Sequence, residues 1–237
     1  VAFDVKNVDW DAVHELYTQM VSGVNSNDEM RNLLIQMIGT LEDKNAFLED
    51  FDPYAYPSYF PTYSPDIEIN YVDSVLLELL EPWGFEWDTT LGDYWGNCVI
   101  DTIPYFDIKH FDFFFTFYNF SSEVHNHLDA PGIIIDIRMS DGVSLAPAEQ
   151  IPGIFTKQSL IAFQTQYRTG PEHDDLSSLV LHDVSPRVWG YTEPIVLLVG
   201  EQNFGAPEAF TSVMGQMPHV TIIGDTTGGG GNIPGYI

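Results

Sequence analysis

The segment from residue 194 to residue 231 constrains the fold more than any other part of this chain. It predicts a strand over 195–199, a tight turn over 203–206, a helix from 206, a second strand over 220–223 and a run of four glycines. The first apolar run is short and β-branched and lies between Pro194 and Gly200, which is typical of a strand covered on both faces. Pro207 fits the first helical turn, where its missing N–H costs nothing, and Glu208 complements the helix dipole. Such a turn aims backbone N–H groups and one side chain at a common point, as an oxyanion hole with a nucleophile does.

A second strand-to-turn unit lies upstream, over residues 132–143. Its sequence GIIIDIRMSDGV is an apolar strand that ends in Asp136 and Arg138 and is followed by a loop with Gly142. A glycine in a loop lets the backbone approach a ligand closely, and the N–H of Gly142 could supply a second oxyanion donor beside that of Ala206.

The remaining patterns predict an α/β protein with a helical N-terminal part. Apolar spacing indicates helices within residues 8–50, and Ser26 with Glu29 forms a capping box that opens the second of them. Residues 51–70 hold four prolines and predict an extended connection, followed by a helix over 72–80. Strands are expected at 99–103, 133–137, 161–167, 195–199 and 220–223, with helices at 146–155 and 206–214 between them.

The order and spacing of several motifs resemble the S41 family of serine peptidases, which includes the C-terminal processing and tail-specific proteases and the tricorn core. The resemblance covers most of the chain and rests on the stretches VDWDAVHELY, LEDKNAF, VIDTIPYFDIKHF, GIIIDIRMSDG, PIVLLVGEQNFGAPEAF and VTIIGDTTGGGG. It implies a ClpP/crotonase-like core of ββα units over 98–237, a helical subdomain over 1–50 and a connecting segment with one helix over 51–97. The connection is too short for the PDZ domain of many relatives. The core is expected to be shortened, since relatives continue beyond Ile237.

Three positions depart from the family pattern where catalysis would take place. The family's nucleophilic serine falls on Gly205, and the histidine of the tricorn-like branch falls on Asn45. The lysine base of the processing-protease branch falls on Gly229. An amide cannot take a proton from a hydroxyl near neutral pH, and the members of such a catalytic unit act jointly. The family's R-G-N-x-G-G loop keeps only Arg138 and Gly142.

The prediction that follows is a protein with a peptidase fold, a peptide or unfolded polypeptide as partner, and no hydrolysis at the family position. One alternative is an active peptidase with a displaced serine or base, for which Ser140, Ser144 and Ser212 are the candidates. Another is a structural or assembly role. Gly205 also has a purely conformational interpretation, because a strand-to-helix turn can require a positive φ angle.

Composition limits the partners further. The chain has 35 acidic residues against eight Lys and Arg, a net charge of −27, which excludes nucleic acid and anionic membranes and favours basic or neutral peptides.

Cys98 is the only cysteine, so no internal disulfide can form. No stretch approaches the ~20 apolar residues that span a bilayer. The start without Met suggests a leader that was removed, and resemblance to exported relatives leads us to expect an extracytoplasmic location, in the periplasm or at the cell surface. A homo-oligomer is left open, since a shortened core would expose a sheet edge.

Other patterns carry no cofactor or metal prediction. His125 and His127 are two residues apart, but no nearby Cys or spaced carboxylate completes a metal site, so surface histidines are expected. The four glycines at 228–231 match no nucleotide-binding motif. The aromatic stretch over 111–120 could be a peptide-binding wall or a dimer contact, but its partial alternation favours an ordinary core strand and a following helix.

Overall fold

The computed structural model describes residues 8–41, 48, 71–89, 95–111, 117–142, 144–167, 169–170 and 174–229. These residues fall into two compact units, the first within residues 1–66 and the second within residues 67–231. The first unit contains helices α1 (Trp10–Val21) and α2 (Asn27–Gly39). The second contains the sheet, the remaining helices and every described residue of the candidate site.

The capping box predicted for α2 is present in a modified form. The hydroxyl of Ser26 accepts a hydrogen bond from the amide of Glu29 at 3.2 Å. The Glu29 carboxylate reaches back to the amide of Asn25, at 2.7 Å, rather than to that of Ser26. Two amides at the start of the helix are therefore satisfied by side chains, which is what a capping box achieves.

The second unit is built on a six-stranded mixed sheet in the order β1-β2-β3-β4-β7-β8. The strands are β1 (Glu86–Trp87), β2 (Trp95–Ile100), β3 (Ile103–Ile108), β4 (Ile133–Asp136), β7 (Ile195–Val199) and β8 (Val220–Gly224). β1, β2 and β3 pair antiparallel, and β3, β4, β7 and β8 pair parallel. The parallel strands end at one edge of the sheet, where ligands bind in open α/β folds. The α/β class predicted from the sequence is confirmed.

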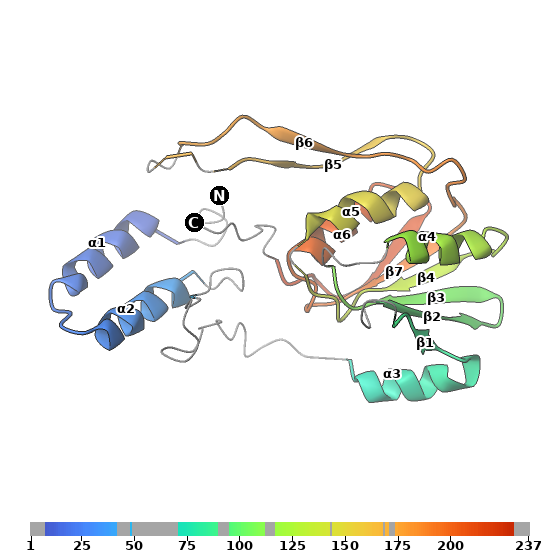
Figure 1. The fold of residues 1–237 in the computed structure, drawn as a ribbon, viewed down its shortest axis with the longest axis horizontal. Coiled ribbons are helices and arrows are strands. Elements are labelled where there is room, and N and C mark those ends of the chain that lie inside the picture. Colours follow the sequence, from blue (N-terminus) through green and yellow to red (C-terminus); the bar gives the residue numbers. More distant parts are fainter. Residues whose placement is uncertain are drawn as a thin grey trace. The chain divides into compact units, whose positions relative to one another are not determined.

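Helices cover both faces of this sheet, as Figure 1 shows. One face carries α4 (Phe117–Asn126), α5 (Leu145–Gln150) with the 3₁₀ turn η2 (Ile151–Ile154), and α6 (Ala206–Met214). The other face carries α3 (Asp73–Leu80) with the 3₁₀ turn η1 (Glu81–Trp83). No PDZ domain is found in the part of the chain that the structure describes.

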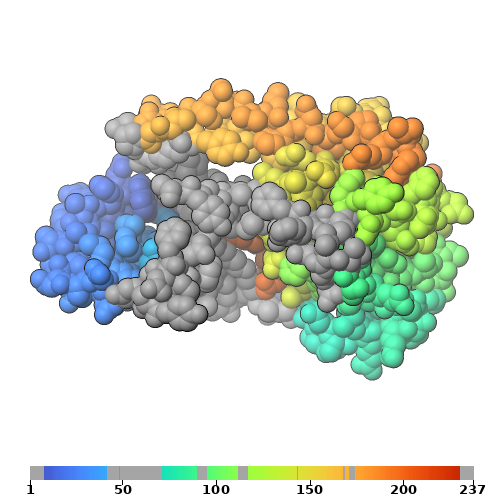
Figure 2. All heavy atoms as spheres, viewed as in Figure 1, coloured from blue at the N-terminus to red at the C-terminus, as the bar shows by residue number. Residues whose placement is uncertain are grey.

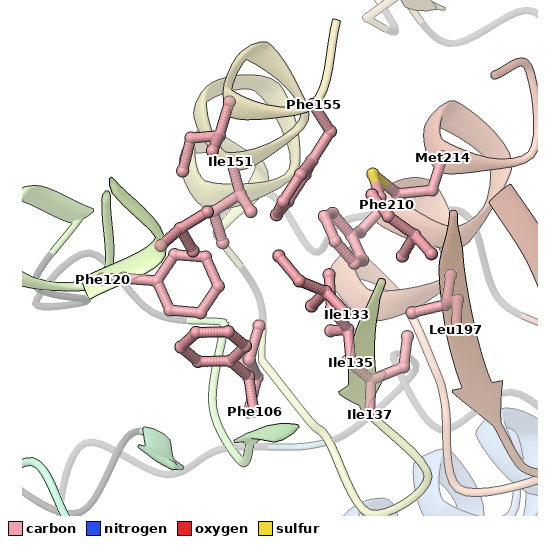
Figure 3. Close-up of a cluster of buried hydrophobic side chains, with 14 of the residues drawn as sticks. Phe106, Phe120, Ile133, Ile135, Ile137, Ile151, Phe155, Leu197, Phe210 and Met214 are labelled. Atoms are coloured by element: carbon pink, nitrogen blue, oxygen red, sulfur yellow. The ribbon is translucent and has the colours of Figure 1, made fainter. Parts of the chain in front are cut away.

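The main core lies between the sheet and the first group of helices (Figure 3). Successive residues of a strand point to opposite faces, so Ile133, Ile135 and Ile137 face these helices while Ile134 faces α3. Phe120 of α4 packs edge-on against Phe106, with ring centroids 5.3 Å apart. Both ends of the aromatic stretch 111–120 are thus core residues, Phe111 and Phe120 each being fully buried.

Two strand predictions were wrong in detail. The predicted strand over 99–103 is interrupted by a two-residue turn between β2 and β3, at Asp101 and Thr102. Asp101 has φ +55°, a left-handed conformation that Asp tolerates better than most residues because its short side chain can bond locally. The apolar residues on both sides of this turn gave no signal for it.

The predicted strand over 161–167 does not join the main sheet. It forms β5 (Leu160–Thr165), which pairs antiparallel with β6 (Val180–Val184), a strand that the pattern analysis missed. These two strands make a separate two-stranded ribbon. Only Ala162 and Val184 of the ribbon are buried, and both pack against Val213 of α6. A strand with so little burial carries little hydrophobic pattern, which explains why β6 escaped prediction.

Candidate functional site

The candidate site is the turn between β7 and α6, at the carboxyl edge of the parallel strands. Gly205 is the N-cap of α6, with φ +71° and ψ −113°, and it has no side chain to cap the helix. Pro207 lies in the first turn of α6, as predicted, and Ala206 is fully buried. A strained turn between a strand and a helix is how α/β hydrolases present a nucleophile. The position that the family resemblance predicts for the nucleophile, Gly205, carries no side chain.

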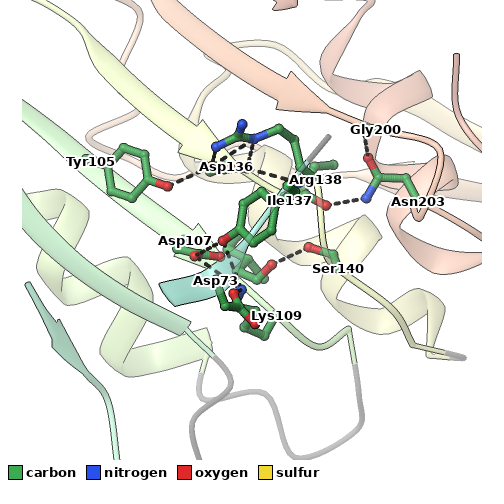
Figure 4. Close-up of polar contacts among 12 residues, drawn as sticks. Asp73, Tyr105, Asp107, Lys109, Asp136, Ile137, Arg138, Ser140, Gly200 and Asn203 are labelled. Atoms are coloured by element: carbon green, nitrogen blue, oxygen red, sulfur yellow. Dashed lines mark hydrogen bonds and ion pairs between the residues drawn. The ribbon is translucent and has the colours of Figure 1, made fainter. Parts of the chain in front are cut away.

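Asn203 fixes this turn, a role that the sequence analysis missed. The residue is fully buried; its Oδ1 accepts from the amide of Gly200 at 2.9 Å and its Nδ2 donates to the carbonyl of Ile137 (Figure 4). Its carbonyl accepts from the amide of Gly228 at 2.8 Å. One side chain thereby joins the ends of β4 and β7. An Asn before a turn is a common signal, but only the neighbouring strand shows what its amide binds.

The second glycine loop lies against the first. Gly142 has φ +133°, and a Cβ there would collide with the backbone of Phe111. The two segments are tied by bonds from Phe111 N to Asp141 O, at 2.7 Å, and from Ser144 N to Phe111 O, at 3.2 Å. The amide of Ala206 donates to the carbonyl of Gly142 at 3.4 Å. The structure therefore brings together the two residues predicted to form an oxyanion hole.

The structure describes one of the two positions that the family resemblance assigns to a catalytic base. Asn45 lies outside the described residues, and Gly229 lies within them. Gly229 has φ +78°, and a Cβ built on it would meet nothing within 4 Å. Glu208 accepts a hydrogen bond from the hydroxyl of Thr227 at 2.8 Å, which places the start of α6 beside the segment after β8.

Among the described residues, none of the three serines proposed as displaced nucleophiles is hydrogen-bonded to a histidine or lysine. The Ser140 hydroxyl is fully buried and donates to the carbonyl of Ile108. Ser144 is the N-cap of α5 and accepts from the amide of Ala146 at 3.4 Å. Ser212 is exposed on α6. Ser140 and Ser144 thus bond to the backbone, and the described residues place no histidine or lysine within hydrogen-bond distance of any of the three.

A histidine and a carboxylate lie next to the Gly142 loop. Nδ1 of His110 is 2.5 Å from Oδ1 of Asp141, and the two residues also form an isolated parallel bridge. Their side chains are 49% and 71% exposed, so the pair faces solvent. His125 and His127, the other histidines considered, lie at the end of α4, where His127 bonds Glu123 at 3.2 Å. Within the described ranges no group of three or more His, Cys, Asp or Glu side chains could hold a metal ion.

The α3 face of the sheet carries a buried charged network that the sequence analysis did not find (Figure 4). Asp107 of β3 and Asp136 of β4 are register partners and are 3% and 1% exposed. Arg138 holds Asp136 through its Nε and Nη2 atoms, at 3.0 and 2.6 Å, and the Tyr105 hydroxyl donates to the same carboxylate at 2.7 Å. Two strands that are distant in sequence thus place their carboxylates side by side.

Asp107 has weaker partners than Asp136. Lys109 lies 3.5 Å from its Oδ2, and the Tyr71 hydroxyl donates to it over 3.4 Å. Lys109 is closer to Asp73 of α3, at 2.7 Å. Burial raises the pKa of Asp107 to about 7, against the opposing attraction of Lys109. The carboxyl is therefore partly protonated at neutral pH.

The architecture and the site together define an α/β protein with a hydrolase-like strand-to-helix turn that lacks a side chain at its centre. Comparison with known families identifies which one. Residues 102–237 match the model of peptidase family S41, and residues 1–39 match that of the tricorn protease C1 domain. Because the first match covers more than half of the chain, this protein belongs to peptidase family S41.

Solved structures agree with this fold. A candidate peptidase from Parabacteroides merdae is 23% identical, with a TM-score of 0.75 over 96% of this chain and 71% of that one. A lipoprotein from Streptococcus agalactiae is 14% identical, with a TM-score of 0.50 over 93% of this chain and 69% of that one. No curated protein sequence matches the chain. At these identities the likeness establishes the fold, and the reaction must be argued from the site.

Proposed function

We propose that this S41-family protein binds peptides or unfolded polypeptide segments and does not hydrolyse them at the family's catalytic position. The observation that carries this proposal is Gly205, which occupies the point where the strand-to-helix turn would present a nucleophile. Glycine has no atom that can attack a carbonyl. Loss of one member of a serine-type catalytic unit removes most of its rate, because the members act together.

The backbone of the site still suits a peptide carbonyl. The Ala206 amide donates to Gly142 over 3.4 Å, which is long for an N–H···O bond and correspondingly weak. A ligand carbonyl that approached this amide more closely would replace a poor hydrogen bond by a good one. Because Gly205 has no side chain, it does not itself occupy the space next to the Ala206 amide.

The charge of the protein favours one kind of peptide. With a net charge of −27, the chain attracts basic segments and repels acidic ones, and salt screens both effects. We expect a basic unstructured peptide to bind more tightly than an acidic peptide of the same length. Raising the salt concentration should reduce the difference.

Fluorescence anisotropy with labelled peptides and mass spectrometry of the same mixtures test both halves of the proposal. The expected result is saturable binding with no cleavage product after prolonged incubation. Cleavage that a serine-directed reagent blocks would overturn the inactive assignment. Absence of binding to any peptide would overturn the binding assignment.

A restoration experiment tests whether side chains alone were lost. Gly205→Ser with Asn45→His supplies the family's nucleophile and base, and Gly205→Ala with Asn45→His adds the same backbone strain without the hydroxyl. Turnover by the first pair and not by the second would support an otherwise intact site. Labelling of the introduced hydroxyl by a fluorophosphonate would report the same property without turnover.

An assembly role is the second candidate, and one observation favours it. β8 is the last strand of the main sheet in the described part of the chain, and its Ile222 and Ile223 are 41% and 50% exposed. An apolar strand at a sheet edge offers unpaired backbone groups to another chain. Light scattering of the wild type and of Ile223→Lys tests this candidate, since self-association through β8 should be lost in the variant.

A further inference from the structure

The β5–β6 ribbon and α5 hold a second constellation of side chains that belongs to none of the family's catalytic positions. The hydroxyl of Thr165 lies 2.8 Å from Nε2 of His182, and Nδ1 of the same ring lies 2.6 Å from Oε1 of Glu149. We call Thr165, His182 and Glu149 the ribbon triad. A hydroxyl, an imidazole and a carboxylate are thus joined in one chain of hydrogen bonds.

A carboxylate next to Nδ1 selects one tautomer of the neutral imidazole. An ionised Glu149 can only accept, so the neutral ring must carry its proton on Nδ1 and donate it to Oε1. Nε2 is then unprotonated and accepts from the Thr165 hydroxyl. This is the proton arrangement of a resting nucleophile, base and orienting acid, in which the base is ready to take the hydroxyl proton.

Packing holds the imidazole in this orientation. The ring of Phe163 stacks on that of His182, with centroids 4.7 Å apart and planes 25° apart. Ala162 and Val184, which lie on the same two strands as Thr165 and His182, anchor one end of the ribbon on α6. A base that is held on both ring nitrogens and on one face loses little entropy when it acts.

Solvent reaches the triad. The side chains of His182 and Glu149 are 19% and 31% exposed, and Thr165 is half-buried. In Figure 2 the ribbon forms a band of yellow and orange atoms at the molecular surface. All three side chains of the ribbon triad are thus partly exposed, which distinguishes Thr165 from the fully buried Ser140.

We propose that Thr165 is a nucleophile that accepts acyl groups from activated acyl donors, such as aryl esters or thioesters, with His182 as its base and Glu149 as the positioning residue. The Thr165 oxygen attacks the acyl carbon while its proton passes to Nε2 of His182. The bond from the carbon to the aryloxide or thiolate then breaks, and the leaving group takes the proton from the imidazolium. Water, activated by the same imidazole, hydrolyses the acyl-threonine and restores the hydroxyl.

Activated donors, and not amides, are the substrates this geometry fits. An aryloxide or thiolate leaves without prior protonation, whereas an amine needs both a proton and stabilisation of the tetrahedral oxyanion. Among the residues that the structure describes, the contacts of the ribbon triad include no pair of backbone N–H groups aimed at such an oxyanion. The inference is independent of Gly205, so a protein inactive towards peptides can still be acylated here.

p-Nitrophenyl acetate is the probe that tests the proposal. The folded full chain is incubated with the ester, the release of p-nitrophenol is followed by absorbance, and the acetylated residue is mapped by peptide mass spectrometry. We expect an acetyl group on Thr165. Thr165→Ser should retain the adduct, since it keeps the hydroxyl, and Thr165→Val should lose it while keeping the shape of the side chain.

Glu149→Gln separates a reactive hydroxyl from a merely structural hydrogen bond. The Gln amide can donate to Nδ1, which moves the ring proton to Nε2 and leaves the Thr165 hydroxyl without a base. Acetylation of Thr165 should then slow by about 100-fold, the usual scale of general-base catalysis, in a variant that circular dichroism shows to be folded. Equal acetylation in this variant, or acetyl groups on lysines with none on Thr165 of the wild type, would overturn the proposal.

Discussion

Replacing Asp107 by Asn should remove a large part of the pH dependence of this protein's stability. Asp107 is 3% exposed, and burial raises the pKa of its carboxyl to about 7 from an ordinary value of 3.8. The folded state therefore binds this proton more tightly than the unfolded state does. The stabilisation from this group is complete below an unfolded pKa near 4 and is lost as the pH rises through about 7.

The size of the effect follows from the two pKa values. Each pH unit between them changes the free energy of unfolding by about 1.4 kcal/mol. Raising the pH from about 5 to about 8 should therefore cost the wild type about 3 kcal/mol through Asp107 alone. The introduced amide cannot ionise, so Asp107→Asn should gain about that much relative to the wild type over the same range. This amide keeps the volume of the carboxyl and can still accept from Tyr71 and Lys109.

Urea unfolding followed by tryptophan fluorescence is a suitable assay. Trp10 lies in the first unit and the other four tryptophans in the second, so a Trp10→Phe background makes the signal report on the sheet. The quantity to plot is the unfolding free energy of Asp107→Asn minus that of the background, at several pH values. Groups that titrate independently of Asp107 cancel in this difference.

Asp73→Asn is the matched control. Asp73 bonds the same Lys109 at 2.7 Å, but its side chain is 62% exposed, so its pairing with Lys109 should be worth less than about 1 kcal/mol. Its difference curve should be nearly flat over the same pH range, because an exposed ion pair contributes little to the unfolding free energy. A flat curve for Asp107→Asn as well would refute the argument, since it would mean that the buried carboxyl is ionised throughout or rehydrated.

Three further substitutions test the site and the core. Gly205→Ala should lower the unfolding free energy by about 1–3 kcal/mol, because a Cβ is strained at φ +71°, and thermal unfolding that matches the wild type would show that the turn relaxes. Asn203→Ala should lower the unfolding free energy by about 2–4 kcal/mol, since the Ile137 carbonyl and the Gly200 amide each lose a hydrogen bond. A loss under about 1 kcal/mol in urea unfolding would contradict the conclusion that Asn203 holds the turn in place. Tyr191→Phe removes a buried bond to the Ala130 carbonyl, 3.0 Å long, and should cost about 1 kcal/mol by the same assay, with no change expected in peptide binding.

Much of the site could be predicted from the sequence because its signals are local. Gly200, Pro207 and the β-branched run before them determine a strand, a turn and a helix, and the structure has β7 and α6 at the predicted residues. Gly142 was predicted to let the backbone approach a ligand closely, and in the structure the segment that lies against it is the backbone of Phe111. Backbone requirements of this kind select a particular residue type, Gly or Pro, at one position, so a single sequence is enough to predict them.

The missed features depend on contacts between residues distant in sequence. Asp107 looks like any strand-end acid until the register of β3 and β4 places it beside Asp136. Thr165 and His182 become neighbours only when β5 pairs with β6, a strand whose own hydrophobic pattern is weak. The turn at Asp101 was missed for a different reason. The apolar residues on both sides predicted a continuous strand, and a single Asp that can adopt a positive φ was too weak a turn signal to change that prediction.

The sequence by itself determined that this is an α/β protein with a glycine at the centre of its strand-to-helix turn, because strand, cap and turn preferences act over a few residues. The tertiary structure alone decided which polar groups meet: the Ala206 amide with the Gly142 carbonyl, and the Thr165 hydroxyl with the His182 ring. Hydrogen bonds form over about 3 Å, and only folding brings groups 17 or 64 residues apart to that distance.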